Sequence, residues 1–262
     1  SGAFCSAGRG GQSPWRPGRA LCLPWRRGGE GCGSTAAAAL GTTAVEFDVH
    51  ATADGIPVLI HDATLARTTN GRGLVRKKTL ADLKALDAGT WFGGAFSSEK
   101  IPTLREALTG LGGTTIACIE IKTAEPIMQA VAADLDQTGS REQAVIFSFK
   151  AKQIAASKRW MPDVPALLLV DGDPAKPHDA SDILTTAKSV GADLLGIDQK
   201  HATRDIVEAI QRAGYPVFVY TVDDPEDIER MVSMGVDGII SNRPRATLSR
   251  VYQIRPPSKN ER

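Results

Sequence analysis

One apolar segment, residues 45–50, carries Glu46, Asp48 and His50 at alternate positions. In a β-strand, residues two apart point to the same face, so these three side chains are expected to lie together. The apolar residues between them would face the other way. Two carboxylates on one buried face repel each other, and at neutral pH they need a cation or a shared proton. Either a metal ion or a basic side chain from a neighbouring strand meets that need.

A second acidic segment complements the first. Glu120 and Lys122 share one face of the apolar segment 119–122, at what would be the carboxyl end of a strand. Three carboxylates without cysteine or clustered histidine favour a hard divalent cation, Mg²⁺ or Ca²⁺, over Zn²⁺. From the residues alone, a metal site formed by Glu46, Asp48 and Glu120 and a purely structural acid–base pairing both remain open.

His61 follows the short apolar run 57–60 and precedes Asp62. A single histidine after a strand is most often a hydrogen-bonded loop residue. Its place shortly after the acidic strand raises a second interpretation, in which His61 donates a proton near a metal-bound phosphate or carbonyl group.

Strand and helix patterns that could position these residues alternate along the chain after residue 35, as in βα units around a parallel sheet. The predicted strands are Ala44–Val49, Thr115–Ile121, Ala144–Phe149, Ala166–Val170, Leu194–Ile197, Val217–Thr221 and Gly238–Ser241. The predicted helices are Ala124–Gln137, Lys150–Trp160, Ala180–Val190, Thr203–Ala213 and Pro225–Met234. Gly191, Gly214 and Gly235 follow three of these helices, where a residue with positive φ commonly ends a helix.

Seven parallel strands in a chain of this length predict a TIM (β/α)₈ barrel whose first strand is absent or replaced. A doubly wound open sheet is the alternative, but no G-x-G-x-x-G motif follows any strand. Residues 62–103 do not fit a single βα unit and include a short helical pattern at Leu80–Leu86. We interpret them as an insertion on the catalytic face, because they follow the carboxyl end of a strand.

The first 34 residues differ in composition from the remainder. They hold nine of the 26 glycines, three of the four cysteines, five arginines and one acid, a formal charge of +4, whereas residues 35–262 carry 26 basic and 29 acidic residues. The segment shows no regular period and fits neither a signal peptide nor a zinc site. We expect residues 1–34 to be an irregular, disordered or non-native leader, 35–254 to be the barrel domain and 255–262 a tail.

Composition also limits the partners. A formal charge of +1 gives no electrostatic case for nucleic acid, and no apolar run approaches the ~18–20 residues that a membrane span needs. The one cysteine of the regular part, Cys118, sits in a predicted strand and favours a reducing cytoplasm.

The chain resembles the glycerophosphodiester phosphodiesterases from about residue 41 to residue 244. The matching motifs, in order, are Glu46-x-Asp48, Asp54-Gly55, His61-Asp62, Arg67-Thr68-Thr69-Asn70-Gly71-x-Gly73, Ile101-Pro102-Thr103-Leu104, Glu120-Ile121-Lys122, Tyr220-Thr221-Val222 and Gly235-Val236-Asp237-Gly238-Ile239-Ile240. Each motif is weak alone, but their shared order is specific. The resemblance implies a metal-dependent TIM barrel that hydrolyses small-molecule glycerophosphodiesters to glycerol 3-phosphate and an alcohol.

The resemblance also assigns roles to individual residues. Glu46, Asp48 and Glu120 match the carboxylates that bind one divalent cation. His61 matches the second of two catalytic histidines, the proton donor to the leaving alcohol. Two further positions match substrate-binding residues, namely Lys122, near the phosphate, and Tyr220, where the family usually has tryptophan.

The start of the chain departs from the family pattern. Family members open with a His-Arg-Gly strand, but here no histidine precedes His50. We therefore expect little or no diesterase activity, and we hypothesise that residues 1–34 are not the segment with which this fold evolved. His50, which shares the face of the carboxylates, is a weak candidate to replace the missing histidine. The alternatives are a catalytically inactive barrel that binds phosphate ligands or acts as a scaffold, and a lyase related to sphingomyelinase D.

Overall fold

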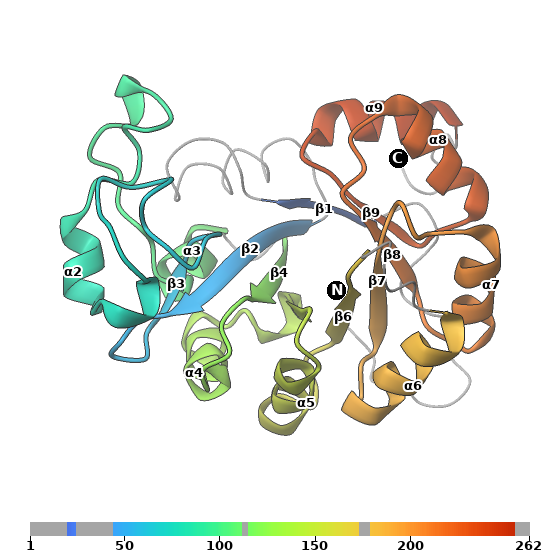
Figure 1. The fold of residues 1–262 in the computed structure, drawn as a ribbon, viewed down its shortest axis with the longest axis horizontal. Helices are drawn as coiled ribbons and strands as arrows, with labels where there is room; N and C mark the ends of the chain where they lie inside the picture. Colours follow the sequence, from blue (N-terminus) through green and yellow to red (C-terminus); the bar gives the residue numbers. More distant parts are fainter. Residues whose placement is uncertain (1–19, 25–43, 112–114, 173–178, 255–262) are drawn as a thin grey trace.

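The computed structural model describes residues 20–24, 44–111, 115–172 and 179–254. Eight parallel strands alternate with helices and form the central sheet of the molecule (Figure 1). The parallel strands are β1 Ala20–Pro24, β2 Ala44–Ala51, β4 Ile116–Ile121, β5 Ala144–Ser148, β6 Ala166–Val170, β7 Leu194–Asp198, β8 Val217–Tyr220 and β9 Gly238–Ile240. A short strand, β3 Pro57–Leu59, pairs antiparallel with the end of β2.

Strand β1 closes the sheet into a barrel. It pairs in parallel with β9, with Cys22 opposite Ile240, and with β2, with Leu23 opposite Val45. Both of its edges are therefore hydrogen-bonded, and so are the edges of β9 and β2 that face it. The sequence resemblance to a TIM barrel is confirmed at the level of strand order.

The presence of β1 differs from our expectation that residues 1–34 lack a regular element. Its sequence, Ala-Leu-Cys-Leu-Pro, shows no clear period, but two open strand edges offer hydrogen-bond partners to any extended segment that lies between them. Residues of the leader therefore occupy the place of the first strand. Without such a strand β2 and β9 would each have an open edge, but here both of those edges pair with β1. The other leader residues and residues 255–262, for which we also stated expectations, lie outside the described residues.

The seven strands predicted from the sequence are all present, with ends that shift by at most two residues. The helices that connect them lie on the outside of the barrel (Figure 1). The α-helices are α2 Leu80–Ala85, α3 Leu104–Leu111, α4 Met128–Thr138, α5 Ala151–Trp160, α6 Ala180–Val190, α7 Arg204–Arg212, α8 Pro225–Met234 and α9 Pro244–Ile254. Three short 3₁₀ helices are η1 Val75–Lys77, η2 Gly94–Phe96 and η3 Arg141–Gln143. The elements β3, α3 and α9 were not predicted from the sequence.

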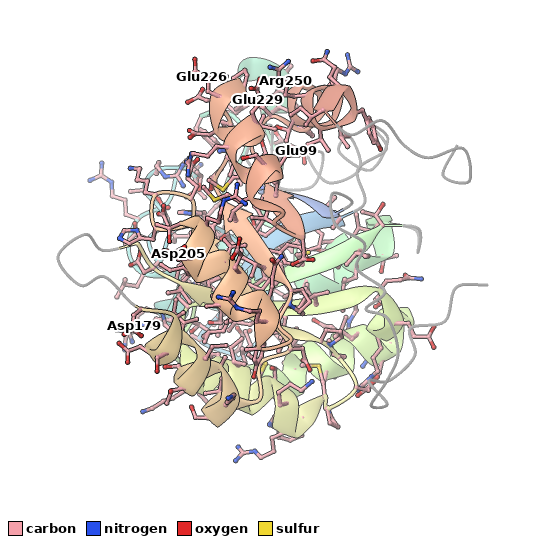
Figure 2. All side chains as sticks on the ribbon, turned by 90° about the vertical axis from the view of Figure 1, so that its right-hand side faces the viewer. Glu99, Asp179, Asp205, Glu226, Glu229 and Arg250 are labelled. Atoms are coloured by element: carbon pink, nitrogen blue, oxygen red, sulfur yellow. The ribbon has the colours of Figure 1, made fainter. Side chains whose placement is uncertain are left out.

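Local signals explain where several helices begin and end. Acidic residues stand in or just before the first turns of α6, α7 and α8, where they complement the positive end of the helix (Asp179, Asp205 and Glu226 in Figure 2). Gly191 and Gly235 end α6 and α8 with φ values of +70° and +78°, as predicted. Each described helix is too short, or not apolar enough, to cross a membrane.

The alternation of side chains along the strands divides the core into two layers. Phe47 and Val49 of β2 pack outward against helices α3 and α4, as predicted, while the residues between them point into the barrel. The barrel interior is filled by apolar residues from seven strands. They are Ala44, Cys118, Val145, Phe147, Leu167, Leu169, Leu194, Phe218 and Ile240.

The insertion at residues 62–103 has a small core of its own. Its apolar side chains, among them Leu65, Val75 and Leu83, pack with Val58 of β3 and with Ile60, which follows that strand. Helix α2 begins with a capping box, in which the Thr79 side chain accepts a bond from the backbone of Asp82 and the Asp82 side chain accepts one in return. Figure 1 shows this region beside β3, at one edge of the molecule.

We predict that Gly238→Ala destabilises the barrel by about 1–3 kcal/mol, because overpacking a filled core forces neighbours to move. A Cβ atom at residue 238 would lie 2.4 Å from ring atoms of the buried Phe218. Urea unfolding followed by circular dichroism measures the change in the free energy of unfolding.

The matched control is Gly110→Ala in α3, where a Cβ atom would meet nothing within 4 Å. That substitution is expected to be neutral or stabilising by up to about 1 kcal/mol, because alanine loses less backbone entropy than glycine in a helix. Equal effects of the two substitutions would contradict the packing argument.

Candidate active site

Three buried carboxylates meet at the carboxyl ends of β2 and β4. Asp48 and Glu120 are register partners on the two neighbouring strands, and Glu46 lies on the same face two residues before Asp48. Their exposed fractions are 5% for Glu46, 4% for Asp48 and 8% for Glu120. One oxygen from each side chain lies within 4.8 Å of the other two. The strand register thus brings together residues that are 72 positions apart in the chain.

Lys122 lies against two of the carboxylates. Its Nζ is 3.1 Å from Asp48 Oδ1 and 3.1 Å from Glu120 Oε1. Burial disfavours the charged amine, but the two carboxylates outweigh burial and raise the pKa of Lys122. Burial also raises the pKa of Glu120, although Lys122 opposes that shift. The ionic pairing that the sequence allowed is therefore present between Lys122 and two of the three carboxylates.

The donor set fits a hard divalent cation. Three buried carboxylates have oxygens within 4.8 Å of one another, and a doubly charged cation would offset their mutual repulsion. All three side chains offer oxygen, the donor that Mg²⁺ and Ca²⁺ prefer. Among the described residues, the group consists of carboxylates alone.

His61 reaches the same place from a different element. It follows β3, and the backbone N–H of Ile60 donates to the Asp48 carbonyl at 3.0 Å, which ties this segment to β2. The His61 Nδ1 lies 2.7 Å from Asp62 Oδ1. Asp62 in turn accepts two hydrogen bonds from the guanidinium of Arg67, at 2.6 and 2.8 Å. No role was predicted for Asp62 or Arg67 from the sequence, although both belong to matching motifs.

A cavity of about 200 Å³ opens above the carboxylates. All six residues that the sequence singled out line it, namely Glu46, Asp48, His61, Glu120, Lys122 and Tyr220. The other lining residues are Phe147, Phe149, Leu169, Thr221 and Ile240.

Phe149 and Tyr220 form an aromatic wall of the cavity. Their ring centroids are 5.7 Å apart in an edge-to-face arrangement, and the Tyr220 hydroxyl donates to the carbonyl of Val170. Burial raises the pKa of Tyr220, so this hydroxyl stays protonated. Phe147 and Phe149 were not predicted as site residues, although they stand at alternate positions of the predicted strand Ala144–Phe149, and such positions share a face.

His50 does not join this cavity. Its side chain is buried with an exposed fraction of 8%, and its Nε2 lies 3.3 Å from the carbonyl oxygen of His61. Burial lowers the pKa of His50 and so favours the neutral ring. Although His50 shares the parity of Glu46 and Asp48, it contacts the backbone of the loop rather than lining the cavity.

Comparisons with known proteins agree with this geometry. The family model described as the glycerophosphoryl diester phosphodiesterase family matches residues 34–246. A glycerophosphodiester phosphodiesterase from Caldanaerobacter subterraneus subsp. tengcongensis is 34% identical over 217 residues, which cover 81% of this chain and 87% of that protein. One from Bacillus subtilis is 31% identical over 220 residues, covering 76% and 73%.

A solved structure also has the same fold. It is a phosphodiesterase from Oleispira antarctica in complex with the product sn-glycerol-3-phosphate, with a TM-score of 0.78, 27% identity and coverage of 88% of this chain and 96% of that one. With the barrel, the acidic site and these matches together, the chain belongs to the glycerophosphoryl diester phosphodiesterase family, whose members are phosphoric diester hydrolases.

Proposed function

We propose that this chain hydrolyses a glycerophosphodiester to glycerol 3-phosphate and an alcohol in the cavity above its three carboxylates. The observation that carries the proposal is the convergence of Glu46, Asp48 and Glu120 with His61 and Lys122 around one cavity. This cavity lies at the carboxyl ends of the barrel strands, where TIM-barrel enzymes have their active sites.

Glu46, Asp48 and Glu120 would hold one divalent cation, Mg²⁺ or Ca²⁺. When bound, such a cation polarises a phosphoryl oxygen and offsets the negative charge of the phosphodiester. The oxygen-only donor set and the burial of three carboxylates within 4.8 Å of one another support this part of the proposal.

The other lining residues have separate tasks in this proposal. Lys122 supplies a fixed positive charge beside the phosphate, where negative charge increases in the transition state. As water forms a new bond to phosphorus and the bond to the alcohol oxygen breaks, His61 donates a proton to that oxygen. Phe149 and Tyr220 form a wall that orients the substrate.

The group that accepts the proton of the attacking water is the weak point of this site. The family resemblance assigns that step to the first strand, which should carry a His-Arg-Gly motif. Strand β1, Ala20–Pro24, carries neither histidine nor arginine. We therefore propose that catalysis by this chain is impaired, since losing one acid–base partner typically lowers a rate ~10²–10⁴-fold.

The same strand favours a second candidate function, a barrel that binds a glycerophosphate ligand without turnover. The acidic site and the aromatic wall would be retained for binding, while the first acid–base group is missing. Detection of glycerol 3-phosphate as a product separates the two candidates, because both allow metal binding.

The compartment that we propose for this chain is a reducing cytoplasm. Cys118 is a core residue in the interior of the barrel, with an exposed fraction of 2%. Cysteine used as a small apolar core residue is typical of proteins in a reducing compartment.

Turnover of glycerophosphocholine is expected to be ~10²–10⁴-fold slower than turnover by the Caldanaerobacter relative at the same Mg²⁺ concentration. An enzymatic assay for glycerol 3-phosphate measures both rates. His61→Ala is expected to remove the remaining activity. Equal rates for the two proteins would contradict the proposed impairment, and complete absence of product with ligand binding intact would favour the second candidate.

We predict that Glu120→Gln stabilises the metal-free protein but weakens cation binding. An acid whose pKa is raised by folding destabilises the fold once both states are ionised, so at neutral pH its neutral replacement removes a cost. The melting temperature in EDTA should rise, by about 2–4 °C per kcal/mol for a chain of this size. The additional stabilisation on adding Mg²⁺ or Ca²⁺ should shrink.

Asp134→Asn is the matched control for the cation experiment. Asp134 is also a buried carboxylate, but it pairs with Arg105 on the outside of the barrel. This variant should keep the full increase in melting temperature on cation addition. The metal assignment would be contradicted if Glu120→Gln also kept the full increase in melting temperature on cation addition, whatever the control variant does.

A further inference from the structure

We propose that Asp62 and Arg67 are positioning residues, which hold the His61 ring in the orientation and tautomer needed to protonate the leaving alcohol. This inference rests on the proposed role of His61 as the proton donor. It assigns a task to the first loop of the insertion, which the family resemblance left without one.

Packing alone does not fix the His61 ring. Its side chain has an exposed fraction of 36%, so about a third of it faces solvent. The backbone is anchored, because Ile60 donates to Asp48 and the His61 carbonyl lies 3.3 Å from His50 Nε2. An anchored backbone does not by itself set the side-chain torsions of a ring that is about one-third exposed. A directed contact is therefore needed to hold the ring.

Asp62 provides that contact. Its Oδ1 lies 2.7 Å from His61 Nδ1, and an ionised carboxylate can only accept hydrogen bonds. The hydrogen must therefore be on Nδ1. This bond leaves Nε2 as the ring nitrogen that can exchange a proton within the cavity that His61 lines. When the ring is protonated, both nitrogens carry hydrogen and the contact of Nδ1 with Asp62 is kept.

Arg67 holds Asp62 in turn. The Arg67 Nε donates to Oδ2 at 2.6 Å and Nη2 donates to Oδ1 at 2.8 Å, so the guanidinium forms a bidentate pair with the carboxylate. This pairing holds the pKa of Asp62 well below its usual range, and the carboxylate stays ionised at any pH at which histidine titrates. The planar two-point contact also fixes the direction in which Oδ1 faces His61.

The loop that carries Arg67 is itself held in place. The buried Leu65 makes backbone hydrogen bonds within the insertion, since its N–H donates to the Gly73 carbonyl at 3.0 Å. The Thr69 hydroxyl and N–H both donate to the Leu65 carbonyl, at 2.6 and 3.1 Å. The guanidinium therefore projects from a closed turn, although its own side chain is 51% exposed.

His61 supplies the proton for the leaving group. As water forms its bond to phosphorus and the bond to the alcohol oxygen breaks, the imidazolium gives its Nε2 proton to that oxygen, and the proton of the attacking water passes to solvent. The neutral ring keeps its Nδ1 hydrogen on Asp62 until a solvent proton restores the imidazolium.

The first test reads the tautomer directly and needs no catalysis. Long-range ¹⁵N–¹H correlation spectra at alkaline pH, with His61 assigned by His61→Ala, should show hydrogen on Nδ1 in the wild-type protein. In Asp62→Asn, the Arg67 guanidinium is expected to pair with the amide oxygen of the new side chain, so that its NH₂ group faces His61 Nδ1. Because an NH₂ group only donates hydrogen bonds, Nδ1 must then accept, and the ring hydrogen should move to Nε2. An unchanged Nδ1–H tautomer in Asp62→Asn would overturn the proposal.

A closely matched control pair exists elsewhere in the chain. Asp136 and Arg141 are also five residues apart and form the same two-point contact, at 2.7 and 3.0 Å, but they contact no cavity residue in any described interaction. Asp136→Asn should leave the His61 tautomer unchanged. A shift of the same size in this control would also overturn the proposal, because it would show a general response to losing surface charge.

The second test separates positioning from structural support. With glycerophosphocholine, Asp62→Asn should lower kcat about 10- to 100-fold with little change in KM. With the p-nitrophenyl ester of glycerol 3-phosphate, whose leaving group needs no proton, kcat should change less than about threefold. Arg67→Lys should give an intermediate loss on the first substrate only. Equal losses on both substrates would overturn the proposal.

The two tests also separate this proposal from the proposed function. If the wild-type chain hydrolysed neither ester, diesterase activity would be excluded, while the tautomer spectra would still decide whether Asp62 and Arg67 hold the His61 ring.

Discussion

The clustering of like charge at the ends of β2 and β4 is the interaction on which the remaining structure depends. Three carboxylates are buried within 4.8 Å of one another, and Lys122 pairs with two of them, Asp48 and Glu120. Such an arrangement costs free energy unless a cation or proton compensates it. It persists because the barrel imposes it: the register of β2 against β4 places Asp48 beside Glu120, and the outward packing of Phe47 and Val49 fixes which face the acids occupy.

The barrel can impose this cost only if the sheet is closed. Strand β1 hydrogen-bonds both β9 and β2, so β2 is held on both edges where it carries Glu46. β1 fulfils that structural task with a sequence that contributes no histidine or arginine to the cavity. Closing the barrel requires only backbone hydrogen bonds from the first strand, whereas catalysis requires particular side chains on it. We propose that β1 of this chain serves the first purpose but not the second.

Much of the site could be predicted from the sequence because its signals are local. The period-two pattern of β2 placed Glu46 and Asp48 on one face, and the motif around His61 marked the loop that follows. The register that pairs Asp48 with Glu120 and the aromatic wall of Phe149 and Tyr220 depend on tertiary contacts. Strand β1 could not be predicted for the same reason, since its pairing partners rather than its own pattern make it a strand. The hydrogen bonds that Arg67 donates to Asp62 depend on the conformation of the loop, for which the sequence carries no regular period. His50 is the opposite case. Its alternate position in the strand matched those of Glu46 and Asp48, but its ring contacts the backbone of the loop at His61.

The most direct test of the metal site is a crystal structure of the chain grown with Ca²⁺ and sn-glycerol 3-phosphate. We predict one cation bound by oxygens of Glu46, Asp48 and Glu120, with the phosphate beside Lys122 and His61 still on Asp62. A structure with the ligand bound but no cation among the three carboxylates would contradict the central claim, because the carboxylates would then persist together without the proposed metal ion.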